Sequence, residues 1–350
     1  MRYLIIKTSS FGDVVQAFGV LNYLKKRVPE ARVDWVVEKK MAALVRAHPL
    51  VNKTIELGAK EWKQNLLNPH TYQQVQEFIK NLREYSYDAV FDLQGNTKSG
   101  CVTFLTKART KVGFGWKTVA EWPNCLATGL RINPPVGQNI RRDYLYLVQS
   151  YFRDFSSLPD EKVELRLDPS EKALLGQYLD LLQTCPWMIS AGSNWENKQL
   201  AFSSLKRFLF LAQKTFHPFF LFTAGNAEEF EMASMCSKLF PHSIICHKLP
   251  LPVLQHLMGK MKLVVTMDAL PLHLAATTNV PTVSFFGPSL GCKYRPPGER
   301  HLSFQGHCPR GSSFEKRCPR LRSCRTAACI HDIDIDLAFA SFAEWWAELV

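Results

Sequence analysis

The sequence lacks any stretch of about 18 uncharged apolar residues, the shortest length that a helix needs to cross a membrane. The apolar run near its start is interrupted by Lys7 and Asp13, which argues against a signal peptide and predicts a cytoplasmic protein. There is also no short internal repeat and no low-complexity tract, so nothing points to a repeat architecture. At 46% hydrophobic and 21% charged residues, the composition is that of an ordinary globular protein.

What the chain does contain is a regular alternation of strand and helix patterns over 350 residues, which is long enough for two domains. The predicted strands are 3–6, 32–37, 53–57, 88–93, 111–115, 186–190, 218–224, 243–246, 262–266 and 281–286. The predicted helices are 13–28, 41–48, 71–85, 97–106, 140–154, 171–183, 203–214, 227–239, 251–259 and 271–278. This alternation predicts parallel sheets with helices on both faces.

We therefore expect an α/β fold with two Rossmann-like domains that face a cleft, over residues 1–160 and 161–335. The segment 156–170, with Pro159 and Pro169, is the expected linker. Residues 336–350 predict a terminal amphipathic helix, because its apolar residues recur at helical spacing and indicate core packing. They are Leu337, Phe339, Phe342, Trp346 and Leu349.

Two places in the sequence put a carboxylate directly after a predicted strand. Asp13 follows the strand 3–6 and a polar turn, and Asp268 follows the strand 262–266, with His273 in the next helix. Ligands of open α/β sheets bind beyond the carboxyl ends of strands, so both are candidate site residues. The structural alternative is that Ser10-x-x-Asp13 is a capping box and that Asp268 caps the following helix.

The net charge of +12 is concentrated near the end of the chain. The segment from Lys293 to Arg325 contains nine basic residues and two glutamates, which gives it a net charge of +7. Such a segment attracts anions such as nucleic acid, an acidic lipid surface or a phosphorylated sugar, unless it is only a solubilising loop. We expect it to dock the protein on an anionic glycolipid surface.

Four cysteines lie in the same Cys- and Arg-rich segment, residues 291–330: Cys308, Cys318, Cys324 and Cys329. In a chain of cytosolic type this density suggests metal before disulfide. No C-x2-C pair is present, however, and this weakens the zinc interpretation. Unlinked thiols, a structural metal site and disulfides all remain open.

Six segments together resemble the heptosyltransferases of glycosyltransferase family 9, most of all the heptosyltransferase I branch. They are MRYLIIKTSSFGDVVQ at the start, VDWVVE (33–38), YDAVFDLQGNTKSG (87–100), GSNWENKQ (192–199), GNAEEFE (225–231) and KLVVTMDALPLHLAA (262–276). The resemblance implies a B-type glycosyltransferase fold, with an acceptor-binding first domain and a donor-binding second domain. It also implies metal-independent transfer, with inversion, from a nucleotide diphosphate sugar to lipopolysaccharide core.

The resemblance assigns a role to each matching residue. Asp13 matches the general base, and Lys198 matches the lysine at the donor's diphosphate. The other matching donor residues are Ser193, Asn194, Glu229, Leu249, Asp268 and His273, and the matching acceptor residues are Lys60, Trp62 and Lys63. Taken one at a time, these residues also have structural explanations. Glu229 could stabilise the start of a helix through the helix dipole, and Trp62 could pack in the hydrophobic core.

The family pattern D-x-G-x-x-H is broken here, because Ala269 and Leu270 follow Asp268 and no glycine is present. Pro271 also lacks an amide donor. We expect ADP-heptose as donor, no cofactor, a lipopolysaccharide core or lipid A acceptor, no nucleic acid, and a position on the inner face of the inner membrane. The alternatives are a different nucleotide sugar, or a non-catalytic protein that binds acidic glycan or nucleic acid.

Overall fold

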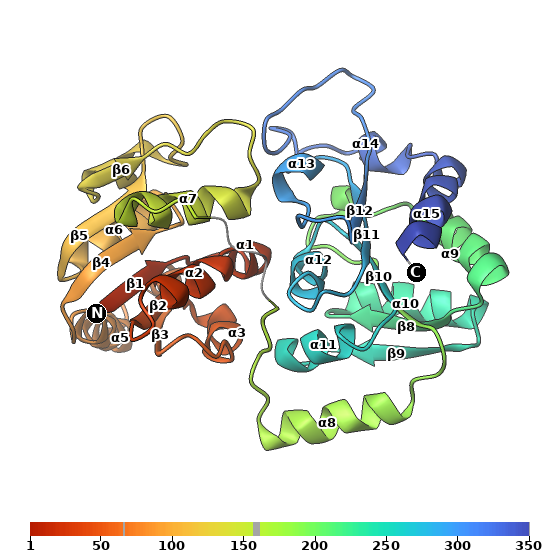
Figure 1. Cartoon of the computed structure of the whole chain (residues 1–350), viewed down its shortest axis with the longest axis horizontal. Helices are drawn as coiled ribbons and strands as arrows, with labels where there is room; N and C mark the ends of the chain where they lie inside the picture. Colours follow the sequence, from red (N-terminus) through yellow and green to blue (C-terminus); the bar gives the residue numbers. More distant parts are fainter. Residues whose placement is uncertain (66, 157–161, 350) are drawn as a thin grey trace. The chain divides into compact units, whose positions relative to one another are not determined.

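A computed structural model of the chain describes residues 1–65, 67–156 and 162–349. The chain divides into two compact units, Met1–Glu161 and Lys162–Val350, each with its own six-stranded parallel sheet (Figure 1). The predicted α/β class with two Rossmann-like domains and a terminal helix is therefore confirmed. Of the predicted linker, Pro159 lies outside the described residues, and Pro169 is the first residue of a helix.

The first unit has the strand order β3-β2-β1-β4-β5-β6. Its strands are β1 (Arg2–Ile6), β2 (Arg32–Glu38), β3 (Lys53–Leu57), β4 (Tyr87–Asp92), β5 (Ala108–Phe114) and β6 (Leu130–Ile132). Its α-helices are α1 (Phe11–Gln16), α2 (Gly19–Arg27), α3 (Ala42–Arg46), α4 (Ala59–Gln64), α5 (Pro69–Leu82), α6 (Thr97–Leu105) and α7 (Ile140–Phe152), with 3-10 turns at Lys39–Met41 and Trp122–Leu126.

Alternate residues of the central strands bury opposite faces of this sheet, as the two-residue period of a strand requires. Leu4 and Ile6 of β1 belong to a core cluster with residues of α5 and α6. On the other face the ring of Tyr3 meets Phe152 of α7, with 5.8 Å between ring centroids. The sheet is thus the middle layer of three.

The second unit repeats the plan with the strand order β12-β11-β10-β7-β8-β9. Its strands are β7 (Pro186–Ser190), β8 (Phe219–Ala224), β9 (Ser243–His247), β10 (Leu263–Met267), β11 (Thr282–Phe286) and β12 (His301–Gln305). Its α-helices are α8 (Pro169–Asp180), α9 (Phe202–Phe216), α10 (Ala227–Leu239), α11 (Leu251–Met258), α12 (Leu270–Ala275), α13 (Gly291–Tyr294), α14 (Ala328–His331) and α15 (Ile335–Leu349), with a 3-10 turn at Glu196–Lys198.

Aromatic packing joins the terminal helix α15 to this second sheet. Phe342 of α15 is fully buried, and its ring lies 5.7 Å from Trp187 of β7 and 5.5 Å from Phe208 of α9. Helix α15 therefore runs beside α9 (Figure 1). The predicted core role of the aromatic stripe holds for Phe339 and Phe342, whereas Leu337 is 68% exposed.

One local prediction was wrong, and two edge strands were missed. The helix predicted at 13–28 is two helices, because Ala17 and Phe18 donate to carbonyls three residues back instead of four and tighten the turn before Gly19. Strands β6 and β12 were not predicted. Both are short strands at the sheet edges with no fully buried residue, so neither has the apolar run that marks a central strand.

Over residues 1–65, 67–156 and 162–349, no helix has the length and hydropathy that crossing a bilayer would require.

Candidate active site

Each sheet has one point at which consecutive strands leave in opposite directions. In the first unit β1 lies between β2 and β4, and in the second β7 lies between β8 and β10. Ligands of such sheets bind beyond the carboxyl ends of the strands at this switch point. The loops after these strands carry the predicted residues Asp13, Ser193, Lys198 and Asp268.

Lys198 and Asp268 form a buried ion pair at the switch point of the second sheet. Lys198 ends the 3-10 turn Glu196–Lys198 after β7, and Asp268 follows β10 directly. Lys198 Nζ lies 2.5 Å from Asp268 Oδ2 and 3.5 Å from the Asp268 carbonyl oxygen, and the two side chains are 9% and 8% exposed. His273 Nε2 lies 3.9 Å from Asp268 Oδ1. The fold thus brings Lys198 to Asp268 and His273, of which Asp268 lies 70 positions later in the sequence.

The electrostatics of this cluster keep the carboxyl group charged. Burial alone would raise the pKa of Asp268, but the charges of Lys198 and His273 and the hydrogen bond from Lys198 outweigh burial and lower that pKa. Asp268 is therefore an anion that holds the Lys198 ammonium in place. A fixed, largely buried ammonium in the loop after β7 is suited to binding an anionic ligand group.

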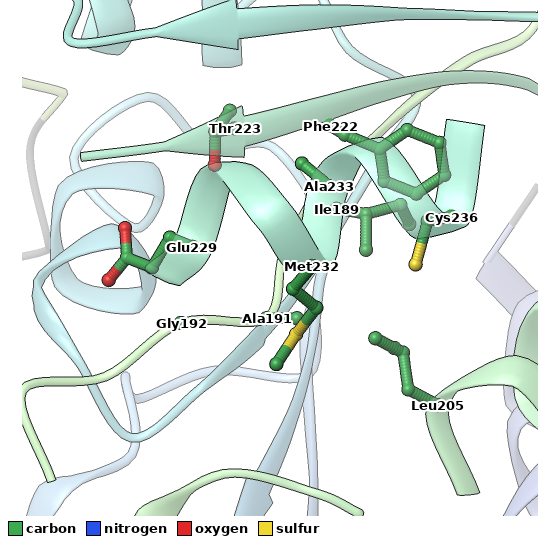
Figure 2. A pocket seen from close by; sticks show the side chains of 10 residues that line it. All are labelled: Ile189, Ala191, Gly192, Leu205, Phe222, Thr223, Glu229, Met232, Ala233 and Cys236. Atoms are coloured by element: carbon green, nitrogen blue, oxygen red, sulfur yellow. The ribbon is translucent and has the colours of Figure 1, made fainter. Parts of the chain in front are cut away.

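Glu229 is one of the residues that line a small pocket in the same unit (Figure 2). Its Oε2 accepts a hydrogen bond of 2.6 Å from the Gly225 amide, and its own amide donates to Asn226 Oδ1 at 2.8 Å. The carboxylate is packed against Gly192, where a β-carbon would come within 2.3 Å of Glu229 Oε1. Glu229 therefore reaches from α10 to the loop that leads to Lys198. The other lining residues are mainly apolar, among them Ile189, Leu205, Phe222, Met232, Ala233 and Cys236.

The remaining predicted donor residues occupy loops of the same unit. Ser193 is half-buried after β7, and its hydroxyl oxygen accepts from the Trp195 amide at 3.4 Å. Asn194 is exposed beside it, and Leu249 is half-buried between β9 and α11. The glycine missing at Leu270 is tolerated locally, because α12 begins there after Ala269 in an extended conformation.

Asp13 is half-buried in the first turn of α1, in the other unit. Its Oδ2 accepts hydrogen bonds from the Ser10 amide at 3.2 Å and from the Ser10 hydroxyl at 2.8 Å. These contacts belong to the capping-box geometry at this helix start, so the carboxylate has a structural task here. They also hold it at the end of β1, where a catalytic role as base would need it.

The neighbouring strand end supports this loop through residues to which sequence reasoning gave no role. Gln94 Oε1, after β4, accepts the Thr8 and Ser9 amides at 3.1 Å each. Asp92 in turn accepts the Gln94 amide at 3.0 Å. The resemblance included both residues within 87–100, but only the parallel pairing of β1 with β4 shows what they hold.

The predicted acceptor residues are all on α4. Lys60 and Lys63 are exposed. Trp62 is half-buried, with its ring 5.4 Å from Phe78 and its Nε1 donating to Gln74 Oε1 at 3.2 Å. Trp62 thus packs within the first unit, whereas the two lysines present their charges to solvent.

Cysteines of the Cys- and Arg-rich segment gather near one another without disulfides. Cys308, Cys318, Cys324 and Cys329 are thiols. Burial, together with the nearby thiols of Cys324, Cys308 and Cys318, raises the pKa of Cys329 to about 11. Among the described residues, no group of three or more His, Cys, Asp or Glu side chains is placed to hold a metal ion.

The same segment touches the loop after β7, which sequence reasoning missed. Asn197 Nδ2 donates to the Leu321 carbonyl, and the Arg322 guanidinium lies over the Trp195 ring, 5.7 Å from its centroid. No spacing rule could have indicated these contacts, because more than a hundred residues separate the partners.

Comparisons with known proteins agree with this layout. The family model described as glycosyltransferase family 9 (heptosyltransferase) matches residues 75–322. A protein of Campylobacter coli named lipopolysaccharide heptosyltransferase 1 is 28% identical over 82% of this chain and 84% of its own length. Its namesake in Pseudomonas aeruginosa is 27% identical over 83% and 79%.

Solved structures resemble the whole chain. The structure of the E. coli heptosyltransferase WaaC with ADP has a TM-score of 0.77 at 22% identity, and the match covers 99% of this chain and 100% of that one. At this identity the match establishes the fold.

Proposed function

Because this chain belongs to glycosyltransferase family 9, the heptosyltransferases, we propose that it transfers a heptose from ADP-heptose to the core of a lipopolysaccharide acceptor. The observation that carries the proposal is the buried Lys198–Asp268 pair with His273 beside it at the switch point of the second sheet. The relatives named lipopolysaccharide heptosyltransferase 1 support the sugar and the acceptor. ADP, bound in the WaaC structure, is the nucleotide we assign to the donor.

The donor's diphosphate binds at Lys198 in this mechanism. The ammonium has three donors, and its contacts with Asp268 aim the group while leaving hydrogen-bonding capacity for phosphate oxygens. Ser193 adds a hydroxyl from the same loop, and the Glu229 carboxylate accepts hydrogen bonds from the ribose hydroxyls. As the bond to the sugar breaks, negative charge grows on the leaving diphosphate, and the fixed cation stabilises it.

Asp13 acts as the general base on the acceptor. An acceptor hydroxyl oxygen attacks the anomeric carbon, its proton passes to an Asp13 carboxylate oxygen, and the nucleoside diphosphate leaves from the opposite face. One displacement inverts the anomeric centre. The contacts from Ser10 support the role, because they orient the carboxylate and general-base catalysis needs correct geometry first.

The acceptor is anionic, and exposed basic residues are suited to it. Lys60 and Lys63 on α4 would meet its acidic sugars and phosphates. Arg310, Arg320 and Arg325 are exposed in the Cys- and Arg-rich segment and would attach the enzyme to the inner face of the inner membrane from the cytoplasm. Lys198 supplies the positive charge at the diphosphate, so transfer proceeds without a metal ion.

The second candidate keeps the transferase and changes the donor. Leu270 and Pro271 replace the family's glycine and remove one amide donor, which favours a site that differs from the family's in its phosphate contacts. Family membership itself argues against the alternative of a non-catalytic binding protein.

One experiment separates these donors. Thermal shift with ADP-, GDP- and UDP-sugars identifies the ligand, since binding to the folded state raises its stability. Sugar transfer to a core oligosaccharide is then measured with and without EDTA, which tests for a metal requirement. NMR of the new linkage reports its anomeric configuration. We expect stabilisation by ADP-heptose, inversion, and no effect of EDTA. Transfer only from GDP- or UDP-sugars would favour the second candidate, and no transfer from any of them would refute the function.

A further inference from the structure

The loop after β7 carries an arginine contact that the proposed mechanism does not use. Trp195, three residues before Lys198, is 39% exposed, and the Arg322 guanidinium lies over its ring. Arg322 itself is exposed. In the parts of the chain that the structure describes, no carboxylate lies within ion-pair distance of Arg322, so its charge is not neutralised by the protein.

A second contact fixes the same two segments together. Asn197 is buried, and its amide nitrogen donates to the carbonyl oxygen of Leu321, the residue before Arg322. The backbone amide of Lys198 bonds to the Trp195 carbonyl at 2.9 Å. Two contacts therefore hold this part of the segment against the turn that carries Lys198. The Leu321 carbonyl accepts the hydrogen bond from Asn197, and the guanidinium of the next residue, Arg322, lies over the Trp195 ring.

A cation–π contact with an indole ring leaves the N–H donors of a guanidinium available. The five N–H donors of arginine lie in the plane of the group, and a cation–π contact at 5.7 Å from the ring centroid does not consume them. Holding the side chain in one orientation also reduces the entropy that it loses when a ligand binds. An arginine in this state is prepared to bind an oxyanion with two parallel hydrogen bonds.

We propose that Arg322 is a second cation of the donor site and contacts the diphosphate of the nucleotide sugar, so that the Cys- and Arg-rich segment forms part of that site. The inference rests on the proposed function, which puts the diphosphate at the loop of Ser193 and Lys198. It assigns to Arg322 a role distinct from that of its neighbours in the basic segment.

Neighbouring arginines provide matched controls. Arg320 and Arg325 are exposed and carry the same charge in the same segment, but no ring contact ties them to the loop after β7. A general effect of segment charge would change binding equally in Arg320→Gln, Arg322→Gln and Arg325→Gln. A specific contact changes only Arg322→Gln.

Calorimetry with ADP, GDP, UDP and inorganic pyrophosphate tests the inference. One of these diphosphates is expected to bind the wild-type protein. Arg322→Gln should weaken its binding by about tenfold, the order expected for one charge-assisted hydrogen bond, and should reduce the salt dependence of binding. The two control variants should stay within about twofold of wild type, and AMP should be affected less than ADP because it lacks the second phosphate.

The possible failures are distinguishable. If Lys198→Ala abolishes diphosphate binding while Arg322→Gln matches Arg320→Gln, the inference is wrong and the proposed function stands. If wild type binds none of the four probes, both are wrong. Trp195→Leu, which removes the ring and keeps the arginine, should cause an intermediate loss. Equal affinity of Trp195→Leu and wild type would contradict the claim that the Trp195 ring orients the Arg322 guanidinium. Thermal melts check that each variant is folded.

Discussion

The loops after β1 and β7 hold equivalent places in two sheets of the same strand order, but they carry opposite charges in different surroundings. In the first unit Asp13 is a half-buried carboxylate that accepts hydrogen bonds from Ser10. In the second unit Lys198 is a buried cation paired with Asp268. One topology therefore provides a group able to take a proton in one unit and a fixed positive charge in the other.

The largest effect that this comparison predicts is on catalysis by Asp13. Asp13→Asn keeps the size of the side chain and removes the base, so turnover should fall by about 10²–10⁴. Steady-state transfer assays with saturating donor measure it, with Glu30→Gln, an exposed carboxylate change in the same unit, as control.

If Asp13 only caps α1, the outcome differs. Asp13→Asn, which keeps an acceptor oxygen for the Ser10 amide of the capping box, would then change folding free energy only slightly and leave turnover near that of Glu30→Gln. Such a result would remove the catalytic role from the first unit.

The next effect concerns attachment to membranes by the second unit. Reversing the charge of Arg310, Arg320 and Arg325 should weaken binding to vesicles rich in anionic lipid by at least about a hundredfold, because each basic residue near such a surface contributes about 1 kcal/mol and each new carboxylate adds repulsion. Turnover of a soluble acceptor fragment should be unchanged. Sedimentation with vesicles at low and high salt checks both the size and the salt dependence.

The matched control reverses three exposed lysines of α9 and α10 in the same unit: Lys206, Lys214 and Lys238. Equal losses in both triple variants would show that only net charge matters.

A smaller effect is expected where Glu229 packs on Gly192. In Gly192→Ala the new β-carbon would come within 2.3 Å of the carboxylate, so Glu229 must leave the Gly225 amide. We expect donor affinity to fall by about tenfold, the order of one lost hydrogen bond to a charged group. Gly176→Ala in α8, where a β-carbon meets nothing within 4 Å, should leave affinity unchanged. Equal donor affinities in Gly192→Ala and Gly176→Ala would show that Glu229 does not contribute to donor binding.

The smallest predicted effect is on stability in acid. Because the pKa of Asp268 is lowered by folding, its ionised form stabilises the protein above the unfolded value of about 3.9. This contribution is lost as the pH falls through the lower folded value. In Lys198→Met the carboxyl is buried without its main cation, so acidification should relieve part of the destabilisation. Urea unfolding of wild type and Lys198→Met from pH 6 downward measures how the free energy of unfolding of each protein changes with pH. Equal pH dependence in the two proteins would contradict the pairing of Lys198 with an ionised Asp268.

The sequence allowed the central strands and most helices to be predicted, because parallel strands buried on both faces are continuous apolar runs such as Leu4–Ile6 and Leu263–Val265. The edge strands β6 and β12 have no such run. The break between α1 and α2 was also missed, since the buried face of Val14, Phe18 and Leu21 continues across it.

Candidate site residues could be proposed from the sequence, but their contacts could not. The approach of Lys198 to Asp268 spans 70 residues and depends on β7 lying beside β10. The arrangement of Arg322 over Trp195 depends on a segment with almost no regular structure, to which no periodicity applies. The roles of Asp13, Lys198 and the acceptor residues stay predictions until they are measured.

The most direct test of the division of labour between the units is ADP binding to two variants by calorimetry. The account predicts that Asp13→Asn binds ADP as wild type does, because that carboxylate belongs to the acceptor step. It predicts that Lys198→Ala loses most of the affinity, while binding of the core oligosaccharide is retained. Normal ADP binding by Lys198→Ala, or a loss confined to Asp13→Asn, would contradict the assignment of the donor to the second unit.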